Sequence, residues 1–405
     1  MPCRRVHSVR NRPVRTLLLV LFVACSSRLV AQQSADGPIT RLNPPNPFRQ
    51  GPKSPVPDGL ATPSVDVIRL PSLPSHNERP VVTAISVSPI GTVLAAAGDD
   101  HAIRIVELKT GKITATLTGH LDWVQCVEFS PNGQQLASCG NDGTLRIWSL
   151  DSNPKLISKK TVTHSLMTLT YLNDESIYVA GFSNRIYRYD GDQRDLSIVH
   201  ACDCRDIRSI VTSPDRKWIA FGGRDGVLRV RRVDLAEQAQ IDVQDGARHL
   251  DSTNENEIAV PLHFDRIRTL QFSEDGSQIT SVGEDRRIIH YDFLHRVVVG
   301  KTEIGGGKLL GLCQLEPHLF AIASSDNTIR IFNDVDQQVH ARLVGHDGSV
   351  SILKRTQKYL ISGSFDTTIR LWDIDQAIAS IDKQGRYVHP VAAQFEDSGA
   401  GVDVK

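Results

Sequence analysis

Residues 123–148 read WVQCVEFSPNGQQLASCGNDGTLRIW, and this stretch decides the fold. Two strand-like runs are separated by the turn residues S-P-N-G and N-D-G. The closing motif begins with Ile or Leu and recurs as IRIV (103–106), LRIW (145–148), IYRY (186–189), LRVR (228–231), IIHY (288–291), IRIF (329–332) and IRLW (369–372). The last residues of these copies lie 42, 41, 42, 60, 41 and 40 positions apart. A period of about 40–45 residues with four strands per unit indicates the blades of a β-propeller.

The second turn of each repeat carries a recurring polar residue. Six copies have aspartate there and the third has Ser183: Asp100, Asp142, Asp225, Asp285, Asp326 and Asp366. Gly119-His120 and Gly345-His346 precede two of the copies, and Trp372-Asp373 closes the last. These residues resemble the WD40-repeat family over roughly residues 64–378. The resemblance implies an all-β, seven-bladed propeller closed by an N-terminal strand, for which Val65 to Leu70 is the candidate.

Three copies share a set of four polar or aromatic residues. These are His120, Ser138, Asp142 and Trp148; His263, Ser281, Asp285 and Tyr291; and His346, Ser362, Asp366 and Trp372. Buried polar groups are tolerated only when each satisfies another, so such residues should occur together. The resemblance implies a structural hydrogen-bond tetrad in each copy, with Tyr291 in place of tryptophan. The same residue types also form catalytic triads, but a triad repeated in three blades favours the structural interpretation.

The N-terminal residues 1–31 have the composition of a secretory signal peptide. Five arginines precede the apolar stretch from Thr16 to Cys25, and Ala31 offers a cleavage point. The apolar core is too short for a membrane-spanning helix, so we expect no transmembrane span. Two alternatives stay open: a lipid anchor on Cys25, or an uncleaved anchor. The signal favours a secreted or periplasmic protein, as expected of an exported bacterial member of the family.

The remaining segments divide the chain further. Residues 32–63 form a Pro-rich, disordered linker in this interpretation, and residues 379–405 form a polar C-terminal tail. The 60-residue interval places an insertion at 241–262, before the fifth blade, on the face that carries the turn aspartates. Its acidic residues could cover a basic patch, contact a partner, or belong to a surface loop without a role.

Composition argues against several classes of function. The net charge is zero, with a pI near 7.2, which disfavours nucleic-acid binding. The sequence has no Gly-rich phosphate loop or H-E-x-x-H motif, so no cofactor or metal is expected. Cys202 and Cys204 after His200 suggest a metal site only weakly, because no further ligand pair has zinc spacing.

Two other cysteines could face each other. If Phe129 opposes Leu136 across the S-P-N-G turn, then Cys126 and Cys139 lie opposite one another on adjacent strands. Buried free thiols are favoured over a disulfide there. An odd number of cysteines after residue 31 also argues against a disulfide framework.

In WD40 propellers the loops before the first strand of each blade and the turns with aspartate share one face. Candidate binding residues on that face are Trp123, Arg208, Arg224, Arg266, Arg268 and Phe365. Tryptophan, phenylalanine and arginine are common anchors in protein interfaces. The four arginines should gather over the fourth and fifth blades, either as a solvated rim or as a site for an acidic peptide or carboxylate ligand. Trp123 could instead pack over its own blade.

We therefore expect a non-enzymatic scaffold for protein–protein interaction that binds a protein or peptide partner on this face. A lactonase-like propeller hydrolase is one alternative. Such an enzyme needs metal-binding side chains at channel-facing starts of the first strands, but those positions are apolar: Val82, Val124, Leu166, Ile207, Ile267 and Val350. An envelope-tethered structural lipoprotein anchored at Cys25 is the other alternative.

Overall fold

The computed structural model describes residues 65–74, 78–191, 195–233 and 257–379. The predicted signal peptide, the Pro-rich linker and nearly all of the C-terminal tail lie outside these ranges. Within them, strands form seven antiparallel sheets of four strands each, followed by one short helix, α1 (Ile374–Ala379). No helix of the described residues is long and apolar enough to cross a membrane.

Each sheet is one blade, numbered here in chain order. Blades 1 to 3 consist of β2 (Val82–Val87), β3 (Val93–Gly98), β4 (Ile103–Glu107) and β5 (Lys112–Leu117); β6 (Val124–Phe129), β7 (Gln135–Gly140), β8 (Thr144–Ser149) and β9 (Lys155–Thr161); and β10 (Leu166–Tyr171), β11 (Ser176–Gly181), β12 (Arg185–Asp190) and β13 (Ser197–Ala201). Blades 4 and 5 consist of β14 (Ile207–Thr212), β15 (Trp218–Gly223), β16 (Val227–Arg232) and β17 (Glu257–Pro261); and β18 (Ile267–Phe272), β19 (Gln278–Gly283), β20 (Arg287–Asp292) and β21 (Val297–Glu303). Blades 6 and 7 consist of β22 (Leu309–Glu316), β23 (Leu319–Ser324), β24 (Ile329–Asn333) and β25 (Gln338–Leu343); and β26 (Val350–Arg355), β27 (Tyr359–Ser364), β28 (Thr368–Asp373) and β1 (Val65–Arg69).

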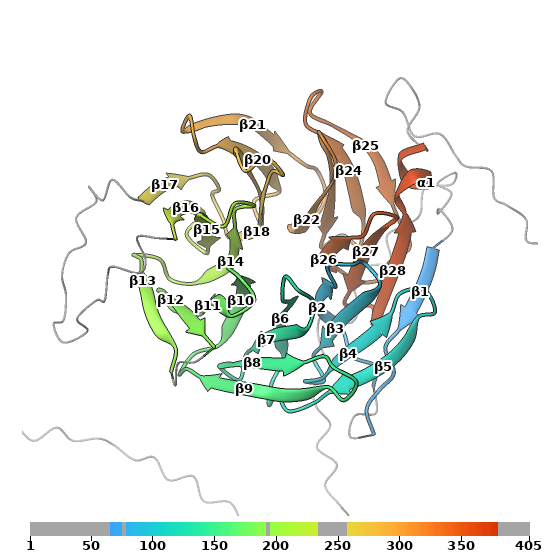
Figure 1. Ribbon diagram of the computed structural model, residues 1–405. Helices are drawn as coiled ribbons and strands as arrows, with labels where there is room; N and C mark the ends of the chain where they lie inside the picture. The colour runs from blue at the N-terminus through green and yellow to red at the C-terminus, as the bar shows by residue number, and fades with distance from the viewer. Residues whose placement is uncertain (1–64, 75–77, 192–194, 234–256, 380–405) are drawn as a thin grey trace, which may run out of the picture. The chain divides into compact units, whose positions relative to one another are not determined.

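The blades stand around a central axis, as Figure 1 shows. The innermost strand of each blade contacts the innermost strand of the next, and β26 of blade 7 contacts β2 of blade 1. The predicted seven-bladed propeller is therefore confirmed. In blade 7, β1 pairs with β28 from Val65 opposite Trp372 to Arg69 opposite Thr368.

Apolar residues fill the spaces between neighbouring blades. Between blades 1 and 2, for example, Ala95 and Ile103 from one sheet pack with Val127, Leu136 and Trp148 from the other. Central strands such as β3, with the sequence VLAAAG, are buried on both faces because a blade covers each side. The small side chains of β3 allow this close approach.

All seven innermost strands carry a β-bulge at the same position. The second residue of each innermost strand has no partner on the neighbouring strand. These unpaired residues are Thr83, Gln125, Met167, Arg208, Arg268, Leu310 and Ser351. Each unpaired residue is half-buried, although the first residue of the strand before it is fully buried. A bulge re-aims the side chain that it adds. Two of the predicted arginines, Arg208 and Arg268, occupy this position.

The extra residues of the 60-residue interval lie elsewhere than predicted. Residues Glu257–Pro261 form β17, the outer strand of blade 4, so the insertion falls between β16 and β17 and not before blade 5. Val227, which follows the turn with Arg224, pairs with Pro261, whereas Arg231 pairs with Glu257. The insertion therefore joins the ends of β16 and β17 that point away from Arg224. Residues 234–256 themselves lie outside the described ranges.

Two of the three predicted tetrads form completely. In blade 7, His346 Nδ1 lies 2.8 Å from Asp366 Oδ2 and its Nε2 lies 2.7 Å from Ser362 Oγ, while Trp372 Nε1 donates to the same hydroxyl at 2.8 Å. In blade 2 the corresponding contacts join His120 to Asp142 at 3.0 Å and to Ser138 at 2.8 Å, and Trp148 donates to Ser138 at 2.9 Å. Each hydrogen-bonding group in these sets has a partner inside the blade.

The tetrad of blade 5 lacks its fourth member. His263 contacts Asp285 at 2.8 Å and Ser281 at 2.9 Å, but no hydrogen bond joins Tyr291 to Ser281 in the described structure. Ser281 donates instead to the carbonyl of Ile289 at 3.4 Å. The prediction that Tyr291 replaces tryptophan in the hydrogen-bond set is therefore wrong. A phenol carries its donor at the far end of the ring, whereas indole carries its N–H on the side that faces the serine in blades 2 and 7.

Blades without the histidine neutralise the turn aspartate with an arginine four residues later. Arg104 contacts Asp100 at 2.6 Å in blade 1, and Arg229 contacts Asp225 at 2.7 Å in blade 4. Blade 6 has the same pair, Arg330 and Asp326. The turn aspartate thus always has a partner where it occurs, since an unpaired buried carboxylate is costly.

The tetrads make folding dependent on pH. Burial lowers the pKa of His120 and His346 below the ordinary 6.5. Burial alone would raise the pKa of Asp366, but the hydrogen bond and charge of His346 hold it at about 2. All three groups bind fewer protons in the folded state than in the unfolded chain. Their stabilisation is therefore complete above pH 6.5 and is lost as the pH falls toward the folded pKa values.

The contrast between blades 7 and 5 predicts unequal effects of two small substitutions. Ser362→Ala should lower the free energy of unfolding by about 2 kcal/mol, because His346 and Trp372 both lose their buried partner. Tyr291→Phe should change it by less than about 0.5 kcal/mol, because its hydroxyl bonds no tetrad member. Urea denaturation measures both. Equal losses in the two variants would contradict the assignment.

Candidate functional site

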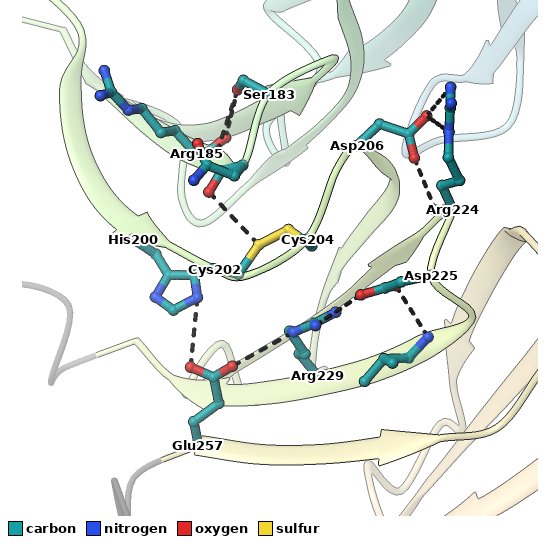
Figure 2. The surroundings of a disulfide bond; sticks show 12 residues. Ser183, Arg185, His200, Cys202, Cys204, Asp206, Arg224, Asp225, Arg229 and Glu257 are labelled. Atoms are coloured by element: carbon teal, nitrogen blue, oxygen red, sulfur yellow. Dashed lines mark hydrogen bonds and ion pairs between the residues drawn. A yellow bond between two sulfur atoms is a disulfide. The ribbon is translucent and has the colours of Figure 1, made fainter. Parts of the chain in front are cut away.

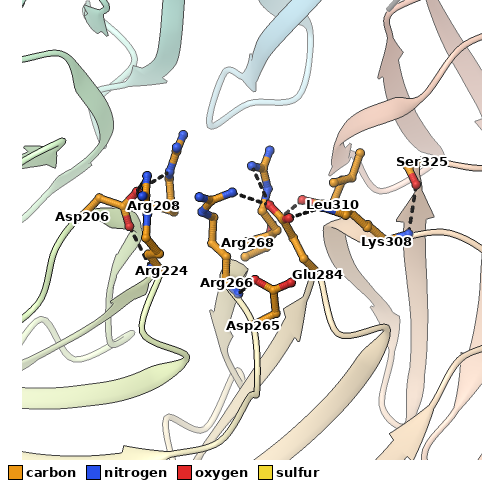
Figure 3. Close-up of polar contacts among 11 residues, drawn as sticks. Asp206, Arg208, Arg224, Asp265, Arg266, Arg268, Glu284, Lys308, Leu310 and Ser325 are labelled. Carbon is orange, nitrogen blue, oxygen red and sulfur yellow. Dashed lines mark hydrogen bonds and ion pairs between the residues drawn. The ribbon is translucent and has the colours of Figure 1, made fainter.

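The upper face of the propeller is defined here as the face that carries the start of each innermost strand and the turn between the second and third strands. On this face, blades 4, 5 and 6 bring together five cationic side chains, as Figure 3 shows. We call Arg208, Arg224, Arg266, Arg268 and Lys308 the cationic cluster. The bulges place Arg208 and Arg268 on the innermost strands, and the other three residues lie on the adjoining turns and loops.

Asp206 organises the blade 4 half of the cluster. It precedes β14 and is almost fully buried. Its Oδ1 accepts the backbone N–H of Arg224 at 2.8 Å, and its Oδ2 accepts Nε of Arg224 at 3.2 Å and Nε of Arg208 at 3.3 Å. The guanidinium of Arg208 also lies over the ring of Phe182, 4.4 Å from its centre. Arg208 is therefore held from two sides.

Glu284 organises the blade 5 half. Its Oε1 lies 2.7 Å from Arg266 and 3.5 Å from Arg268, and its Oε2 lies 2.5 Å from Lys308 of blade 6. Burial alone would raise the pKa of Glu284, but the hydrogen bonds from Lys308 and Arg266 lower it below its ordinary value. One carboxylate thus faces three cations.

The cluster keeps an excess of positive charge. Arg208 and Arg224 share the carboxylate of Asp206, and Arg266, Arg268 and Lys308 share that of Glu284. With Asp265 beside them, the charge is 5 − 3 = +2. Burial, together with the charges of Arg266 and Arg268, lowers the pKa of Arg208 to about 10 against the opposing effect of Asp206. Nε of Arg266 is buried without a hydrogen-bond partner among the described residues. A bound anion would neutralise this excess charge.

The structure brings together the four predicted arginines but not the two predicted aromatic residues. Trp123 lies before β6 of blade 2, and Phe365 lies in the turn between β27 and β28 of blade 7. Both are half-buried. They occupy different blades from the cluster, so they do not belong to this site.

Sequence reasoning missed two contributors. Lys308 directly precedes β22 as Arg266 precedes β18, so the repeat alignment could have identified it. The contact of Phe182 with Arg208 depends on packing between blades 3 and 4. Pairing across blades is not visible in a repeat alignment.

The loop that leads to Asp206 contains a disulfide, which Figure 2 shows. Cys202 and Cys204 are bonded to each other, and the backbone N–H of Cys202 donates to the carbonyl of Asn184 at 2.9 Å. The bonded sulfurs are therefore not metal ligands in this structure. Nearby, Glu257 lies 3.5 Å from His200 and 4.0 Å from Arg229, so these residues link the outer edges of blades 3 and 4.

The remaining cysteines bear out the predicted register. Phe129 opposes Leu136, and Cys126 opposes Cys139 on β6 and β7. Both thiols are free, as is that of Cys313. Burial raises the pKa of Cys139 and of Cys313, the latter to about 11, so both are poor nucleophiles at neutral pH.

The described residues contain no group of three or more His, Cys, Asp or Glu side chains that could hold a metal ion. The strand starts that were expected to face the channel are instead buried between blades: Val82, Val124, Leu166, Ile207, Ile267 and Val350. These residues are apolar because they pack between blades. Their apolar character therefore does not test the enzymatic alternative.

Fold and site together define a β-propeller with a charged surface on its upper face. Five segments match the WD40 family, described as WD domain, G-beta repeat: residues 68–107, 111–149, 196–231, 258–292 and 337–373. Each match begins in the outer strand of one blade, or one residue before it, and ends in the third strand of the next. The chain belongs to the WD40-repeat family.

Curated relatives are WD-repeat proteins of low identity. Nuclear distribution protein nudF of Emericella nidulans is 26% identical over 336 residues, which cover 80% of this chain and 64% of that protein. The nudF protein of Aspergillus terreus is 26% identical over 308 residues, or 74% of this chain and 60% of its own length. Apoptotic protease-activating factor 1 of Danio rerio is 25% identical over 272 residues, 65% of this chain and 19% of its own. The chain thus spans less than two thirds of each of these relatives.

The role of Glu284 predicts an anion-dependent stability. Glu284→Gln should lower the free energy of unfolding by about 2 kcal/mol, because three cations lose their shared charge partner. Sulfate should restore more stability to this variant than sodium chloride of equal ionic strength does. Glu303→Gln, which removes a half-exposed ion pair with Arg286, should cost less than about 1 kcal/mol. Thermal and urea denaturation measure these effects, and no sulfate preference in Glu284→Gln would contradict the anion site.

Proposed function

We propose that this chain is a non-enzymatic scaffold that docks an acidic segment of a partner protein on the cationic cluster. WD40 propellers generally mediate protein–protein interaction, and the chain has that fold. The observation that carries the proposal is the excess positive charge at blades 4 to 6, where five cations share the carboxylates of Asp206 and Glu284 and Asp265 is the third carboxylate beside them.

The geometry supports an extended carboxylate-bearing ligand. Arginine binds carboxylates through paired N–H donors, and the half-exposed guanidinium of Arg224 stands at the solvent side of the cluster. Arg208 and Arg268 lie deeper, on the innermost strands. Cations at different depths suit several carboxylates in succession better than a single small anion.

A direct binding measurement tests this proposal. A fluorescent peptide of eight glutamates should bind the protein with an affinity that falls as salt is added. The triple variant Arg208→Ala, Arg266→Ala, Arg268→Ala should bind it at least about tenfold more weakly. Fluorescence anisotropy measures both, with circular dichroism as the test of folding.

A matched control removes as much charge from the opposite face. Lys109, Lys155 and Lys217 are exposed at the ends of strands on the lower face, and their replacement by alanine should leave the affinity unchanged. A peptide of eight glutamines should not bind. If both triple variants bind the glutamate peptide like the wild type, the cluster is not the docking site.

We further propose that the chain is exported, with cleavage after Ala31. The arginines that precede the apolar stretch from Thr16 to Cys25 support this, as does the Cys202–Cys204 disulfide, because disulfides persist in oxidising compartments. N-terminal sequencing of the protein from its native cells should find Gln32 first. An acylated Cys25 would show a lipid anchor instead, and a chain that begins at Met1 would contradict cleavage.

A further inference from the structure

Phe264 is a solvent-exposed apolar side chain on the upper face. It is 81% exposed, although it lies between His263 of the blade 5 tetrad and Arg266 of the cationic cluster. Such exposure is unfavourable, because burial of a phenylalanine side chain stabilises by roughly 1.5–3 kcal/mol. A partner that covered Phe264 would gain part of this free energy.

The tetrad fixes the backbone that carries Phe264. Asp285 Oδ2 accepts the backbone N–H of Phe264 at 3.1 Å while its Oδ1 contacts His263. The same device holds the residue after histidine in the other two blades, where Asp142 accepts the N–H of Leu121 and Asp366 accepts that of Asp347, both at 3.0 Å. Each tetrad thus holds one residue at the surface, and in blades 2 and 5 that residue is apolar and exposed.

Two cations lie over the ring of Phe264. The guanidinium of Arg287 on β20 lies 4.5 Å from the ring centre, and Nζ of Lys301 on β21 lies 5.2 Å from it. Because β20 and β21 are the third and outer strands of blade 5, Phe264 lies farther from the axis than Arg268 on β18. Blade 5 thus carries two cations, Arg287 and Lys301, farther out than the cluster, with one exposed aromatic ring beneath them; the carboxylate of Glu303 lies 4.0 Å from Arg287.

We propose that Phe264, with Arg287 and Lys301, is a platform for an aromatic side chain of the docked acidic segment. This inference rests on the proposed function. The occupant follows from charge complementarity: the cations beside the ring favour a segment whose other residues are acidic, and cation–π attraction strengthens when the ring is covered and desolvated. A segment that covers Phe264 would also extend its contact with the protein from Arg266 toward the outer strands of blade 5.

The spacing of the platform defines the probe. Phe264 and Arg266 are two residues apart in the bend that precedes β18. An aromatic residue of the partner should therefore lie within a few residues of its nearest acidic residue. The experiment uses peptides of eight glutamates followed or preceded by Ser-Trp, and matched peptides with Ser-Ala.

On the wild type, one of the tryptophan peptides should bind about tenfold more tightly than its alanine counterpart. Phe264→Ala should abolish this difference and leave the affinity for the alanine peptide unchanged. Leu121→Ala provides the matched control, because Leu121 is 75% exposed at the equivalent position of blade 2. That variant should keep the tryptophan preference.

The outcomes separate this inference from the proposed function. If the alanine peptides bind with salt dependence but tryptophan adds nothing, or if Phe264→Ala keeps the preference, the platform is refuted while the docking of acidic segments stands. If no acidic peptide binds, the proposed function itself fails. If the wild type sediments as a dimer and Phe264→Ala as a monomer, a second copy of the chain covers the ring, which also refutes the platform.

Discussion

Each blade of this protein has two apolar faces, and only a neighbour on both sides removes them from water. Strands such as β3, with VLAAAG, have no solvent-facing side at all. A sheet of this kind is stable only in a closed ring, where the contact between β26 and β2 completes the series. The site, the tetrads and the exposed loops all depend on this closure, because each is built from residues that adjacent blades hold in place.

Because the closed ring buries both faces of every blade, the loops at the upper and lower faces of the propeller are the places where a binding site can form. The bulge in every innermost strand turns one residue per blade out of the packed interior, and in blades 4 and 5 that residue is arginine. Asp206 and Glu284 then gather the neighbouring cations without neutralising them. In blade 5, Asp285 also connects the interior to the surface, since it binds the tetrad histidine and holds the backbone of Phe264. The carboxylate of Asp285 thus both stabilises the interior of blade 5 and fixes the position of Phe264 at the surface.

The sequence predicted the blade number, two complete tetrads and the gathering of four arginines, because all three follow from the register of the repeat. The insertion was misplaced because the sequence repeat begins one strand earlier than the structural blade, so residues 257–261 belong to blade 4. Tyr291 was misjudged because the direction of a donor, and not only its presence, decides a buried hydrogen bond. The contacts of Phe182 with Arg208 and of Lys308 with Glu284 cross from one blade to the next, and no pattern within a single repeat encodes them.

The account places docking on the upper face of blades 4 and 5, and hydrogen exchange with mass spectrometry tests that placement most directly. The measurement compares the free protein with the protein saturated by an octaglutamate peptide. Protection of the loops around Asp206, Arg224, Arg266 and Lys308, with no change in the turns of the lower face, is the predicted result. Protection confined to the lower face, or to the upper face of blades 1 and 2, would contradict the account.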